Sequence, residues 1–311
     1  MLKLTFLILI SSLSAWASKE ITLTEVTQFG SNPGQLKMFY YAPKKLDPKA
    51  ALIVVVHGCT QSAGEFDDET GWTNVADKHG SLLLFPQQTE KNNQSRCFNW
   101  FMPSQTTRNL GEAHSIFEMI EEMKKLFNIN DQKVSIVGLS AGAAMSSVML
   151  ASYPEVFSSG ALVAGIPFGC ANNAFNAWTC MFAQDFPPTS ARSRADYVRR
   201  ASDFTGEYPR VLVMQGSADN LVNPRNGQFN LEQWVHVHQL EHTSPTRTLT
   251  TRFEKTEYIR RKQSKVTLIS LHNVAHGYPI SVKKKCGKPS KYIIEADFCA
   301  SEVIAEFFDL K

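Results

Sequence analysis

Short apolar runs alternate with helical patterns along this chain. Six runs rich in β-branched and aliphatic residues are typical of strands buried on both faces: 51–56, 81–85, 133–137, 161–164, 210–214 and 266–271. Apolar residues recur at helical spacing over 112–127, and helices are also expected over 141–152 and near 303–308. The alternation predicts an α/β fold with a mostly parallel sheet covered by helices on both faces.

Two segments depart from this alternation. Near the start, strands over 21–28 and 35–41 are separated by the turn sequence Ser31-Asn32-Pro33-Gly34. The stretch 169–208 has little periodicity and is expected to be an excursion over the sheet. Because no linker, repeat or low-complexity tract divides the chain, residues 18–311 are expected to form a single domain.

The first 17 residues have the organisation of a signal peptide. Lys3 precedes an apolar stretch over 4–10, and Ala15-Trp16-Ala17 supplies the small residues of a cleavage site. The alternative is a membrane anchor, but the stretch is shorter than the about 20 apolar residues that a spanning helix needs. The sequence therefore predicts secretion to the periplasm or the cell exterior, without stable membrane insertion.

Composition narrows the function classes. The chain is 43% hydrophobic and 20% charged, a globular balance that excludes a disordered or low-complexity protein. Its net charge is +3, from 32 basic and 29 acidic residues, and no basic run, Lys283 to Lys285 included, exceeds three residues. Because no basic stripe with interleaved aromatic residues is present, no nucleic-acid partner is expected.

Export changes the interpretation of the six cysteines. An even number in an exported chain favours disulfides, although six cysteines allow 15 connectivities. One of these connectivities pairs each cysteine with its neighbour along the chain. In this connectivity, the two disulfides that close short loops are better supported than the one that closes the longest loop. A metal site is the alternative, but the chain has no Cys-x-x-Cys pair or Cys/His cluster at ligand spacing. The neighbour pairs are Cys59–Cys97, Cys170–Cys180 and Cys286–Cys299.

Candidate chemistry begins at Ser140. The segment Gly138-Leu139-Ser140-Ala141-Gly142 fits the pattern G-x-S-x-G, with a predicted strand before it and a predicted helix after it. This is the setting of a nucleophile elbow, a tight turn that lifts the serine hydroxyl above the sheet. The alternative is a glycine-rich turn without chemistry. The strand–turn–helix context favours a nucleophile.

A serine nucleophile of this kind needs an acid and then a histidine later in the chain. Asp219 and His276 each follow a predicted strand in that order, although Asp219 has the alternative role of a turn or cap residue. His272 is a rival at a strand end, but Gly277 gives the backbone around His276 more freedom. Three other histidines lie on an expected helix, where exposed positions are the default: His236, His238 and His242.

Two N–H groups are needed to hold the oxyanion that develops during attack. One is expected from Ala141, the residue after the nucleophile. The other is expected from Cys59, because the apolar strand over 51–56 runs directly into His57-Gly58-Cys59. His57 then shapes this loop rather than acting as a base. Acyl transfer by these groups requires no metal ion and no cofactor.

Several segments together resemble one family. The similarity is carried by His57-Gly58-Cys59-Thr60-Gln61-Ser62, the segment from Gly71-Trp72 to Gly80, Phe85-Pro86-Gln87-Gln88, Arg96-Cys97-Phe98-Asn99-Trp100-Phe101 and Gly138-Leu139-Ser140-Ala141-Gly142. These resemble the polyhydroxybutyrate (PHB) depolymerase-like esterases, which belong to the α/β-hydrolase superfamily beside feruloyl and acetylxylan esterases. The segment Ala275-His276-Gly277-Tyr278-Pro279 is similar to the histidine loop of the extracellular polymer depolymerases.

The resemblance covers roughly residues 36–310 and carries specific implications. It implies the same triad of Ser140, Asp219 and His276. It also implies Cys59 as an oxyanion donor, and a Cys59–Cys97 bridge that fixes the donor's loop. The chain lacks the Trp that feruloyl-type relatives tend to have soon after this histidine. No linker and separate substrate-binding domain follow, so crystalline polymer is not the expected substrate.

The sequence thus predicts a secreted serine hydrolase that cleaves carboxylic esters, with hydroxyalkanoate oligomers or polymers as the first substrate class. An acetylxylan or feruloyl-type carbohydrate esterase is the nearest rival, and a serine peptidase is another. A catalytically inert binding protein would normally have lost a member of the triad. Four aromatic residues are expected near the substrate or in ordinary packing: Trp100, Phe101, Trp178 and Phe182.

Overall fold

The protein was analysed as a computed structural model that describes residues 23–183 and 190–310. The predicted signal peptide, 1–17, lies outside the described residues. The strands are β1 (Thr24–Val26), β2 (Lys37–Tyr41), β3 (Ala50–Val56), β4 (Leu82–Gln87), β5 (Ile129–Leu139), β6 (Ser159–Val163), β7 (Arg210–Gly216), β8 (Thr246–Leu249), β9 (Phe253–Arg260), β10 (Gln263–Leu271), β11 (Tyr278–Ile280) and β12 (Ile293–Glu295). The helices are α1 (Ala63–Thr70), α2 (Trp72–His79), α3 (Pro103–Thr106), α4 (Gly111–Leu126), α5 (Ala141–Ser152), α6 (Ala174–Met181), α7 (Ala191–Arg199), α8 (Arg225–Val237) and α9 (Ala300–Phe307), with a 3-10 turn η1 (Pro154–Val156).

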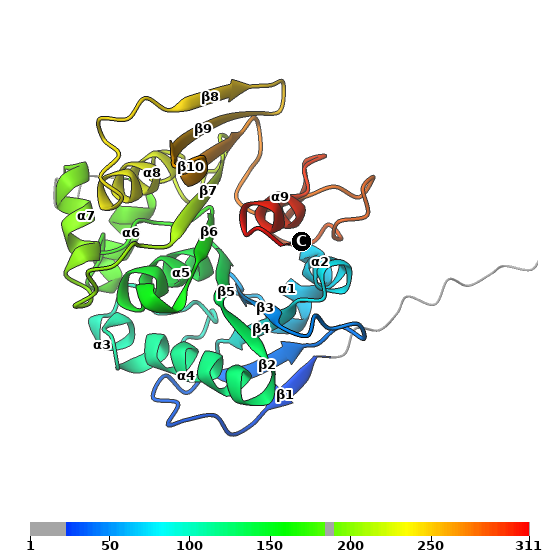
Figure 1. The fold of residues 1–311 in the computed structure, drawn as a ribbon. Helices are drawn as coiled ribbons and strands as arrows, with labels where there is room; N and C mark the ends of the chain where they lie inside the picture. The colour runs from blue at the N-terminus through cyan, green and yellow to red at the C-terminus, as the bar shows by residue number, and fades with distance from the viewer. Residues whose placement is uncertain (1–22, 184–189, 311) are drawn as a thin grey trace, which may run out of the picture.

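A ten-stranded sheet runs through the molecule in the order β1-β2-β4-β3-β5-β6-β7-β10-β9-β8 (Figure 1). Its six central strands, from β4 to β10 in that order, are parallel. The strands at both edges pair antiparallel. The prediction of a mostly parallel sheet in an α/β fold is therefore confirmed.

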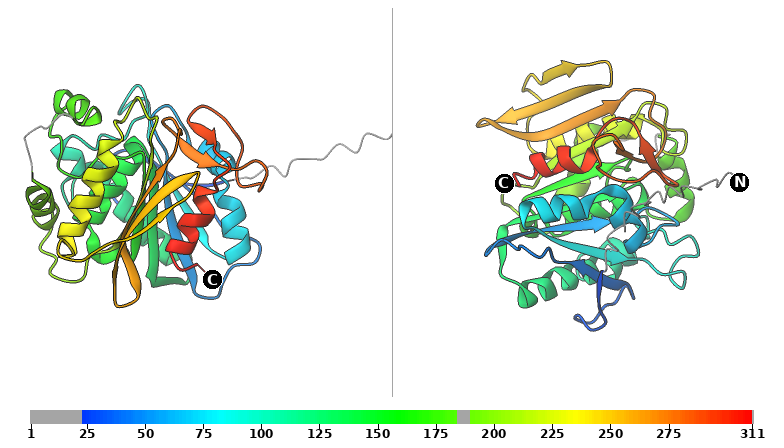
Figure 2. Two further views of the ribbon diagram at one scale, coloured as in Figure 1. Left: turned by 90° about the horizontal axis from the view of Figure 1, so that it is seen from above. Right: turned by 90° about the vertical axis from the view of Figure 1, so that its right-hand side faces the viewer.

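Alternate residues of the central strands build two hydrophobic layers. In β3, Leu52 and Val54 face the layer formed with α4, α5, α7 and α8, whereas Ile53 and Val55 face the layer formed with α1, α2 and α9. Successive side chains of a strand point to opposite faces, so a strand buried on both faces must be apolar throughout. Figure 2 shows the two layers, with α1, α2 and α9 on one side of the sheet.

Each of the six predicted inner strands is present, and the two strands expected near the start of the chain correspond to β1 and β2, which pair antiparallel. The stretch 169–208 is more regular than the sequence suggests, because it contains α6 and α7. His238 also differs from expectation. It caps α8 in a buried position, where its Nε2 donates to the Pro209 carbonyl oxygen at 3.0 Å.

The parallel strands bring the candidate residues to one edge of the sheet. β3 ends immediately before His57 and β5 ends immediately before Ser140. The loops after β7 and β10 carry Asp219 and His276. In open α/β sheets this carboxyl edge is where ligands bind.

Candidate active site

The backbone at Ser140 forms a sharp turn between β5 and α5. Ser140 has φ 55° and ψ −118°, a conformation that residues with a side chain rarely adopt. A Cβ on Gly138 would lie 2.3 Å from the Gly142 carbonyl carbon, and one on Gly142 would lie 2.3 Å from the Val56 carbonyl oxygen. Both glycines are therefore required for β5, α5 and β3 to approach so closely.

Three side chains form a continuous hydrogen-bonded relay beginning at this turn. His276 Nε2 lies 3.0 Å from Ser140 Oγ, and His276 Nδ1 lies 2.8 Å from Asp219 Oδ2. His276 and Asp219 are buried, while Ser140 is partly exposed. The fold thus brings together residues that are 136 and 57 positions apart in the chain.

The Asp219 carboxylate is saturated with donors. Its Oδ2 also accepts from Gln215 Nε2 at 2.9 Å, and its Oδ1 accepts from the N–H groups of Leu221 and Val222 at 3.0 and 2.8 Å. Four donors on one carboxylate fix its orientation. Asp219 is therefore poised to stabilise a positive charge on His276.

The loops that carry Asp219 and His276 are tied to each other. The N–H of Ala218 donates to the Val274 carbonyl oxygen at 3.0 Å, and the N–H of Asn273 donates to Ser217 Oγ at 2.9 Å. A Cβ on Gly216 would lie 2.2 Å from the same Val274 oxygen. The close contact therefore depends on glycine at the end of β7.

Tyr292 supports the histidine from outside the relay. Its ring meets the His276 imidazole edge-on, with 5.8 Å between the ring centroids. The Tyr278 N–H donates to the Tyr292 carbonyl oxygen at 2.8 Å, and a Cβ on Gly277 would lie 2.6 Å from that oxygen. Sequence reasoning missed Tyr292, because nothing local indicates that this segment folds back onto the histidine loop.

The loop after β3 is held close to the segment 95–97. Cys59 is disulfide-bonded to Cys97, and the N–H of Thr60 donates to the Ser95 carbonyl oxygen at 2.6 Å. Arg96 Nη2 donates to the Thr60 carbonyl oxygen, also at 2.6 Å. Within the described part of the chain, no hydrogen bond uses the Cys59 N–H. Together with the N–H of Ala141 in the first turn of α5, it is free to serve a ligand.

His57 is fixed as a neutral imidazole. Its Nδ1 donates to the Gly58 carbonyl oxygen at 2.7 Å, because a carbonyl only accepts, and its Nε2 accepts from the N–H of Gln88 at 3.1 Å. Burial lowers the pKa of His57 to about 4. Both ring nitrogens are occupied, which agrees with a role in shaping the loop.

The remaining predicted residues fall into place around this arrangement. The rival His272 is partly exposed, and its Nδ1 lies 3.3 Å from the Thr251 carbonyl oxygen rather than at Ser140. The other two disulfides join Cys170 to Cys180 and Cys286 to Cys299, so all three bridges connect cysteines that are neighbours along the chain.

Among the described residues, no group of three or more His, Cys, Asp or Glu side chains is arranged to hold a metal ion. No helix in the same residues is long and apolar enough to cross a bilayer.

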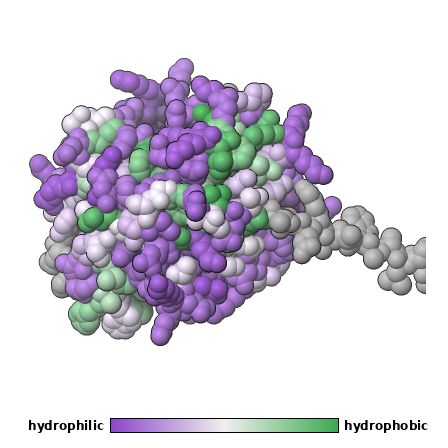
Figure 3. Space-filling model, turned by 90° about the horizontal axis from the view of Figure 1, so that it is seen from below, coloured by the Kyte–Doolittle hydropathy of each residue, from purple (hydrophilic) through white to green (hydrophobic). Residues whose placement is uncertain are grey.

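An exposed apolar surface lies on α6, beside this arrangement. The α6 aromatic face consists of Phe175, Trp178 and Phe182, whose exposed fractions are 73%, 58% and 38%. Much of the molecular surface is hydrophilic, as the face in Figure 3 illustrates. The N–H of Asn223, in the segment that follows Asp219, donates to the Met181 carbonyl oxygen at 2.7 Å. The helix is thus joined directly to the Asp219 loop.

A buried apolar cluster connects α6 with the serine turn as well. Cys180 of α6 packs in it with Ala144, one turn after Ser140, and with Val222 of the Asp219 loop. Trp100 packs against the cluster from the segment that follows Cys97. Trp100 and Phe101 are partly buried and meet edge-on at 5.4 Å. Their position near the site agrees with expectation, but much of their surface serves packing.

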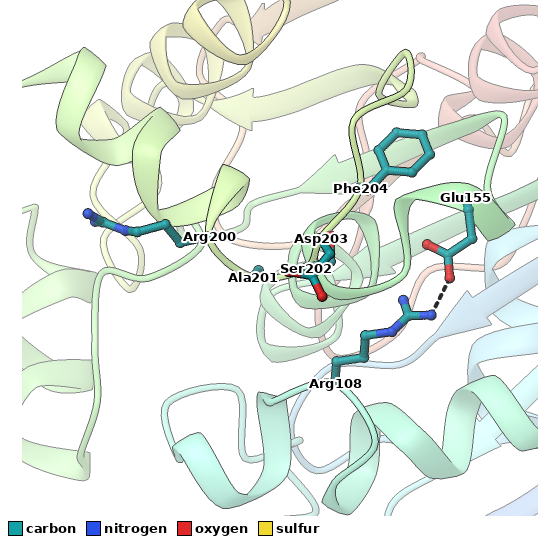
Figure 4. Close-up of a pocket in the computed structure, with 7 residues that line it drawn as sticks. All are labelled: Arg108, Glu155, Arg200, Ala201, Ser202, Asp203 and Phe204. Carbon is teal, nitrogen blue, oxygen red and sulfur yellow. Dashed lines mark hydrogen bonds and ion pairs between the residues drawn. The ribbon is translucent and has the colours of Figure 1, made fainter.

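A hollow of about 580 Å³ elsewhere in the molecule is lined by Arg108, Glu155 and the segment 200–204 (Figure 4). Its cations already have partners. Arg108 donates to Glu155 and stacks over the Tyr153 ring, and Arg200 stacks over the ring of Tyr197. This hollow therefore offers no comparable set of reactive groups.

Comparisons with known proteins agree with this geometry. The sequence matches the family described as Esterase PHB depolymerase over residues 37–255. It is 34% identical to poly(3-hydroxyalkanoate) depolymerase C of Paucimonas lemoignei, over 96% of this chain and 72% of that protein. It is 33% identical to feruloyl esterase B of Talaromyces stipitatus, over 84% of this chain and 74% of that protein.

The fold has solved counterparts. The structure of an acetyl xylan esterase from Aspergillus awamori aligns with a TM-score of 0.78 at 23% sequence identity, covering 93% of this chain and all of that chain. At this identity the likeness establishes the fold, which is that of the α/β-hydrolases. Sequence and fold together show that the chain belongs to the Esterase PHB depolymerase family and is a carboxylic ester hydrolase.

Proposed function

We propose that the protein is a serine esterase that cleaves hydroxyalkanoate esters through Ser140, His276 and Asp219. The observation that carries the proposal is the unbroken relay from Ser140 Oγ through His276 to Asp219, at 3.0 and 2.8 Å. A serine hydroxyl is a weak nucleophile alone, and a hydrogen-bonded imidazole is the group that activates it.

The reaction proceeds in two steps. His276 Nε2 takes the Ser140 proton as Oγ attacks the ester carbonyl carbon, and Asp219 stabilises the resulting imidazolium. The imidazolium then protonates the leaving alcohol, and an acyl group remains on Ser140. In the second step His276 takes a proton from water, the hydroxyl attacks the acyl carbon, and the carboxylic acid leaves as Oγ regains its proton.

The N–H groups of Cys59 and Ala141 hold the oxyanion in both steps. They come from different elements, the loop after β3 and the first turn of α5. Donors that point in advance to where negative charge develops stabilise the transition state more than the ground state. The loss of one such donor costs about 3 kcal/mol.

The substrate class is supported by a depolymerase relative and by a stretch of the chain without charged residues that carries exposed aromatic side chains. The polyester depolymerase of Paucimonas lemoignei is similar over nearly the whole chain. Residues 156–183 contain no Asp, Glu, Lys, Arg or His, and this stretch carries the α6 aromatic face. Such a surface suits a neutral polyester better than an acidic polysaccharide. Release of acetyl or feruloyl groups from carbohydrate is the second candidate, favoured by the similarity to feruloyl esterase B.

We also propose that residues 18–311 act as one catalytic domain outside the cytoplasm. Both helix layers pack on the same sheet, and three disulfides are typical of proteins that fold in an oxidising compartment. The predicted cleavage after residue 17 agrees with this location. N-terminal sequencing of protein recovered from culture medium and periplasm tests both the cleavage and the destination.

The decisive experiment compares Ser140→Ala with Ser147→Ala. Ser140 immediately precedes α5, and Ser147 lies within α5. In the described structure the buried Ser147 hydroxyl has no hydrogen-bond partner. Hydrolysis is measured on p-nitrophenyl esters, 3-hydroxybutyrate oligomers and acetylated or feruloylated xylan. We expect Ser140→Ala to lose at least about 10⁴-fold in kcat and Ser147→Ala to remain active. Activity that survives in Ser140→Ala contradicts the mechanism, and turnover of xylan esters alone replaces the proposed substrate.

A further inference from the structure

One buried carboxylate beneath the Cys59 loop has no part in the mechanism above. Glu112 lies in the first turn of α4 and is 1% exposed. Among the described residues, no Lys, Arg or His lies at ion-pair distance from it. Burial raises its pKa to about 7, against the opposing effect of its hydrogen bonds. A carboxyl group is costly to bury, so its local connections are informative.

Three donors from two segments converge on Glu112. Gln88 Nε2 and Asn99 Nδ2 donate to Oε1 at 2.7 and 2.6 Å, and the Asn99 N–H donates to Oε2 at 2.8 Å. Gln88 follows the last residue of β4, and Asn99 lies two residues after Cys97. The carboxylate thus joins two segments whose contacting residues, Gln88 and Asn99, are eleven positions apart.

The first connection leads from Gln88 to the turn before Cys59. The Gln88 N–H donates to His57 Nε2 at 3.1 Å, and His57 Nδ1 donates to the Gly58 carbonyl oxygen at 2.7 Å. That carbonyl belongs to the peptide unit whose nitrogen is the N–H of Cys59. Holding Gln88 therefore sets the plane of the peptide that carries the oxyanion donor.

The second connection leads from Asn99 to Cys59 through a covalent bond. Asn99 is held by both its backbone and its side chain, and Cys97 is disulfide-bonded to Cys59. Gln88 Nε2 also lies 3.2 Å from the Cys97 carbonyl oxygen, which ties the two connections together. Displacement of Glu112 would loosen the Cys59 loop from both sides.

We propose that Glu112 is a positioning residue for the oxyanion donor at Cys59. It touches no substrate, and it acts through Gln88 and His57 on one side and through Asn99 and Cys97 on the other. Oxyanion donors work at about 2.7–3.1 Å from the charge, and supporting groups must hold them within about 0.5 Å. The inference rests on the proposed function, since it assigns a role within that site.

The same helix offers a matched control. Glu118 of α4 also accepts three hydrogen bonds, from the N–H and Oγ of Ser31 at 2.7 and 2.8 Å and from the N–H of Asn32 at 2.7 Å. These contacts anchor the turn between β1 and β2. Glu112→Gln and Glu118→Gln therefore each replace a hydrogen-bonded carboxyl group on the same helix by an amide, but only the first does so beneath the Cys59 loop.

The test measures kcat and KM on a soluble p-nitrophenyl ester, together with the inhibition constant of an alkyl boronic acid that mimics the tetrahedral intermediate. We expect Glu112→Gln to lower kcat at least about 10-fold with KM changed less than about 3-fold. The boronate affinity is expected to fall by a factor similar to that for kcat/KM, because both report transition-state binding. Glu118→Gln is expected to keep kcat and boronate affinity.

If Glu112→Gln does not fold, Asn99→Ala is the milder variant, because it removes one donor and leaves the backbone bond to Glu112. It is expected to lower kcat about 3-fold or more with KM unchanged. Wild-type kcat in a folded Glu112→Gln, or in Asn99→Ala where the first does not fold, overturns the proposal. Equal losses in Glu112→Gln and Glu118→Gln also overturn it. If Ser140→Ala keeps wild-type activity, the proposed function fails and this inference with it.

Discussion

The floor and the rim of the site are built by different means. The floor consists of the proposed catalytic groups, namely Ser140, Asp219, His276 and the N–H groups of Cys59 and Ala141, and it stands on the ends of parallel strands. Backbone contacts leave it little freedom, because a Cβ added at Gly216 would lie only 2.2 Å from the Val274 carbonyl oxygen. The rim is the α6 aromatic face, where large side chains project from one short helix into solvent.

This difference indicates how chemistry and selectivity are separated. A change in the floor alters the position of a reacting group, so every ester should be affected. A change in the rim removes exposed surface without disturbing the sheet, so only a substrate long enough to reach α6 should be affected. The experiments below alter one region while leaving the other in place.

The largest effect is expected from Asp219→Asn. The amide presents an N–H where His276 needs an acceptor, so the imidazole loses its tautomer and its stabilised cation. We expect kcat to fall about 10⁴-fold on short esters and oligomers alike, with little change in KM. Asp203→Asn, in the exposed segment after α7, should retain full activity. A loss confined to oligomers would show that Asp219 belongs functionally to the rim.

The disulfides provide a second way to separate the regions. Cys59–Cys97 fastens the floor and closes a separation of 38 residues, whereas Cys170–Cys180 fastens α6 and closes one of 10. Replacing the first pair with serine should lower the free energy of unfolding by about 1 kcal/mol more than replacing the second, by the loop-length dependence. Denaturant titrations under non-reducing conditions measure this difference.

Activity distinguishes the same two pairs more sharply. Loss of the Cys59–Cys97 disulfide leaves the proposed oxyanion donor, the Cys59 N–H, less firmly positioned. It should therefore reduce kcat/KM about 10²-fold on every ester. Loss of Cys170–Cys180 should leave p-nitrophenyl acetate turnover within about twofold and slow only long substrates. Equal effects of the two double variants on p-nitrophenyl acetate would abolish the distinction between floor and rim.

A smaller effect, on stability alone, is expected outside both regions. Asp67 of α1 is buried, and its Oδ1 has no hydrogen-bond partner in the described residues. Burial and the nearby Asp68 and Asp77 raise its pKa from 3.8 to about 8. Because the folded state prefers the protonated acid, the contribution of Asp67 to the free energy of unfolding is greatest below pH 3.8. This contribution is lost as the pH rises toward 8.

Asp67→Asn should remove this pH dependence. We expect the free energy of unfolding of the variant, relative to that of the wild type, to increase as the pH rises from 4 to 8, by about 3 kcal/mol in total. Asp196→Asn is the control, since Asp196 pairs with Arg199 on α7 and is not among the groups that raise the pKa of Asp67. Chemical denaturation at several pH values measures the gain, and kcat should stay unchanged. A constant difference between variant and wild type across this range would show that Asp67 is ionised throughout.

The sequence is sufficient to predict the strands and the serine turn on which the floor stands, because local patterns determine them. Strands buried on both faces appear as uninterrupted apolar runs. The serine turn requires glycine at positions 138 and 142, because a Cβ at either position would collide with neighbouring backbone. The order of acid and histidine along the chain then follows from the order of strands. The hydrogen bonds of the relay agree with these assignments.

The rim and the support beneath the floor could not be predicted in the same way. Phe175, Trp178 and Phe182 have helical spacing, but an apolar stripe normally indicates a buried face, and here it faces solvent. Glu112 lies in a helix first turn, where an acidic residue is ordinarily exposed. Its burial depends on Gln88, 24 residues earlier, which no local pattern reveals.

The smallest effect, and the most direct test of the rim, is expected from Trp178→Ala. Partial burial of an indole against a polyester chain is worth about 1 kcal/mol, so hydrolysis of 3-hydroxybutyrate oligomers and amorphous polyester film should fall about fivefold. Turnover of p-nitrophenyl acetate should stay unchanged, because a two-carbon acyl group does not extend to α6. Leu249→Ala, which truncates a side chain that is 75% exposed on the edge strand β8, controls for a general loss of apolar surface. Equal rates for Trp178→Ala and Leu249→Ala on film would remove α6 from substrate binding and leave selectivity to the floor.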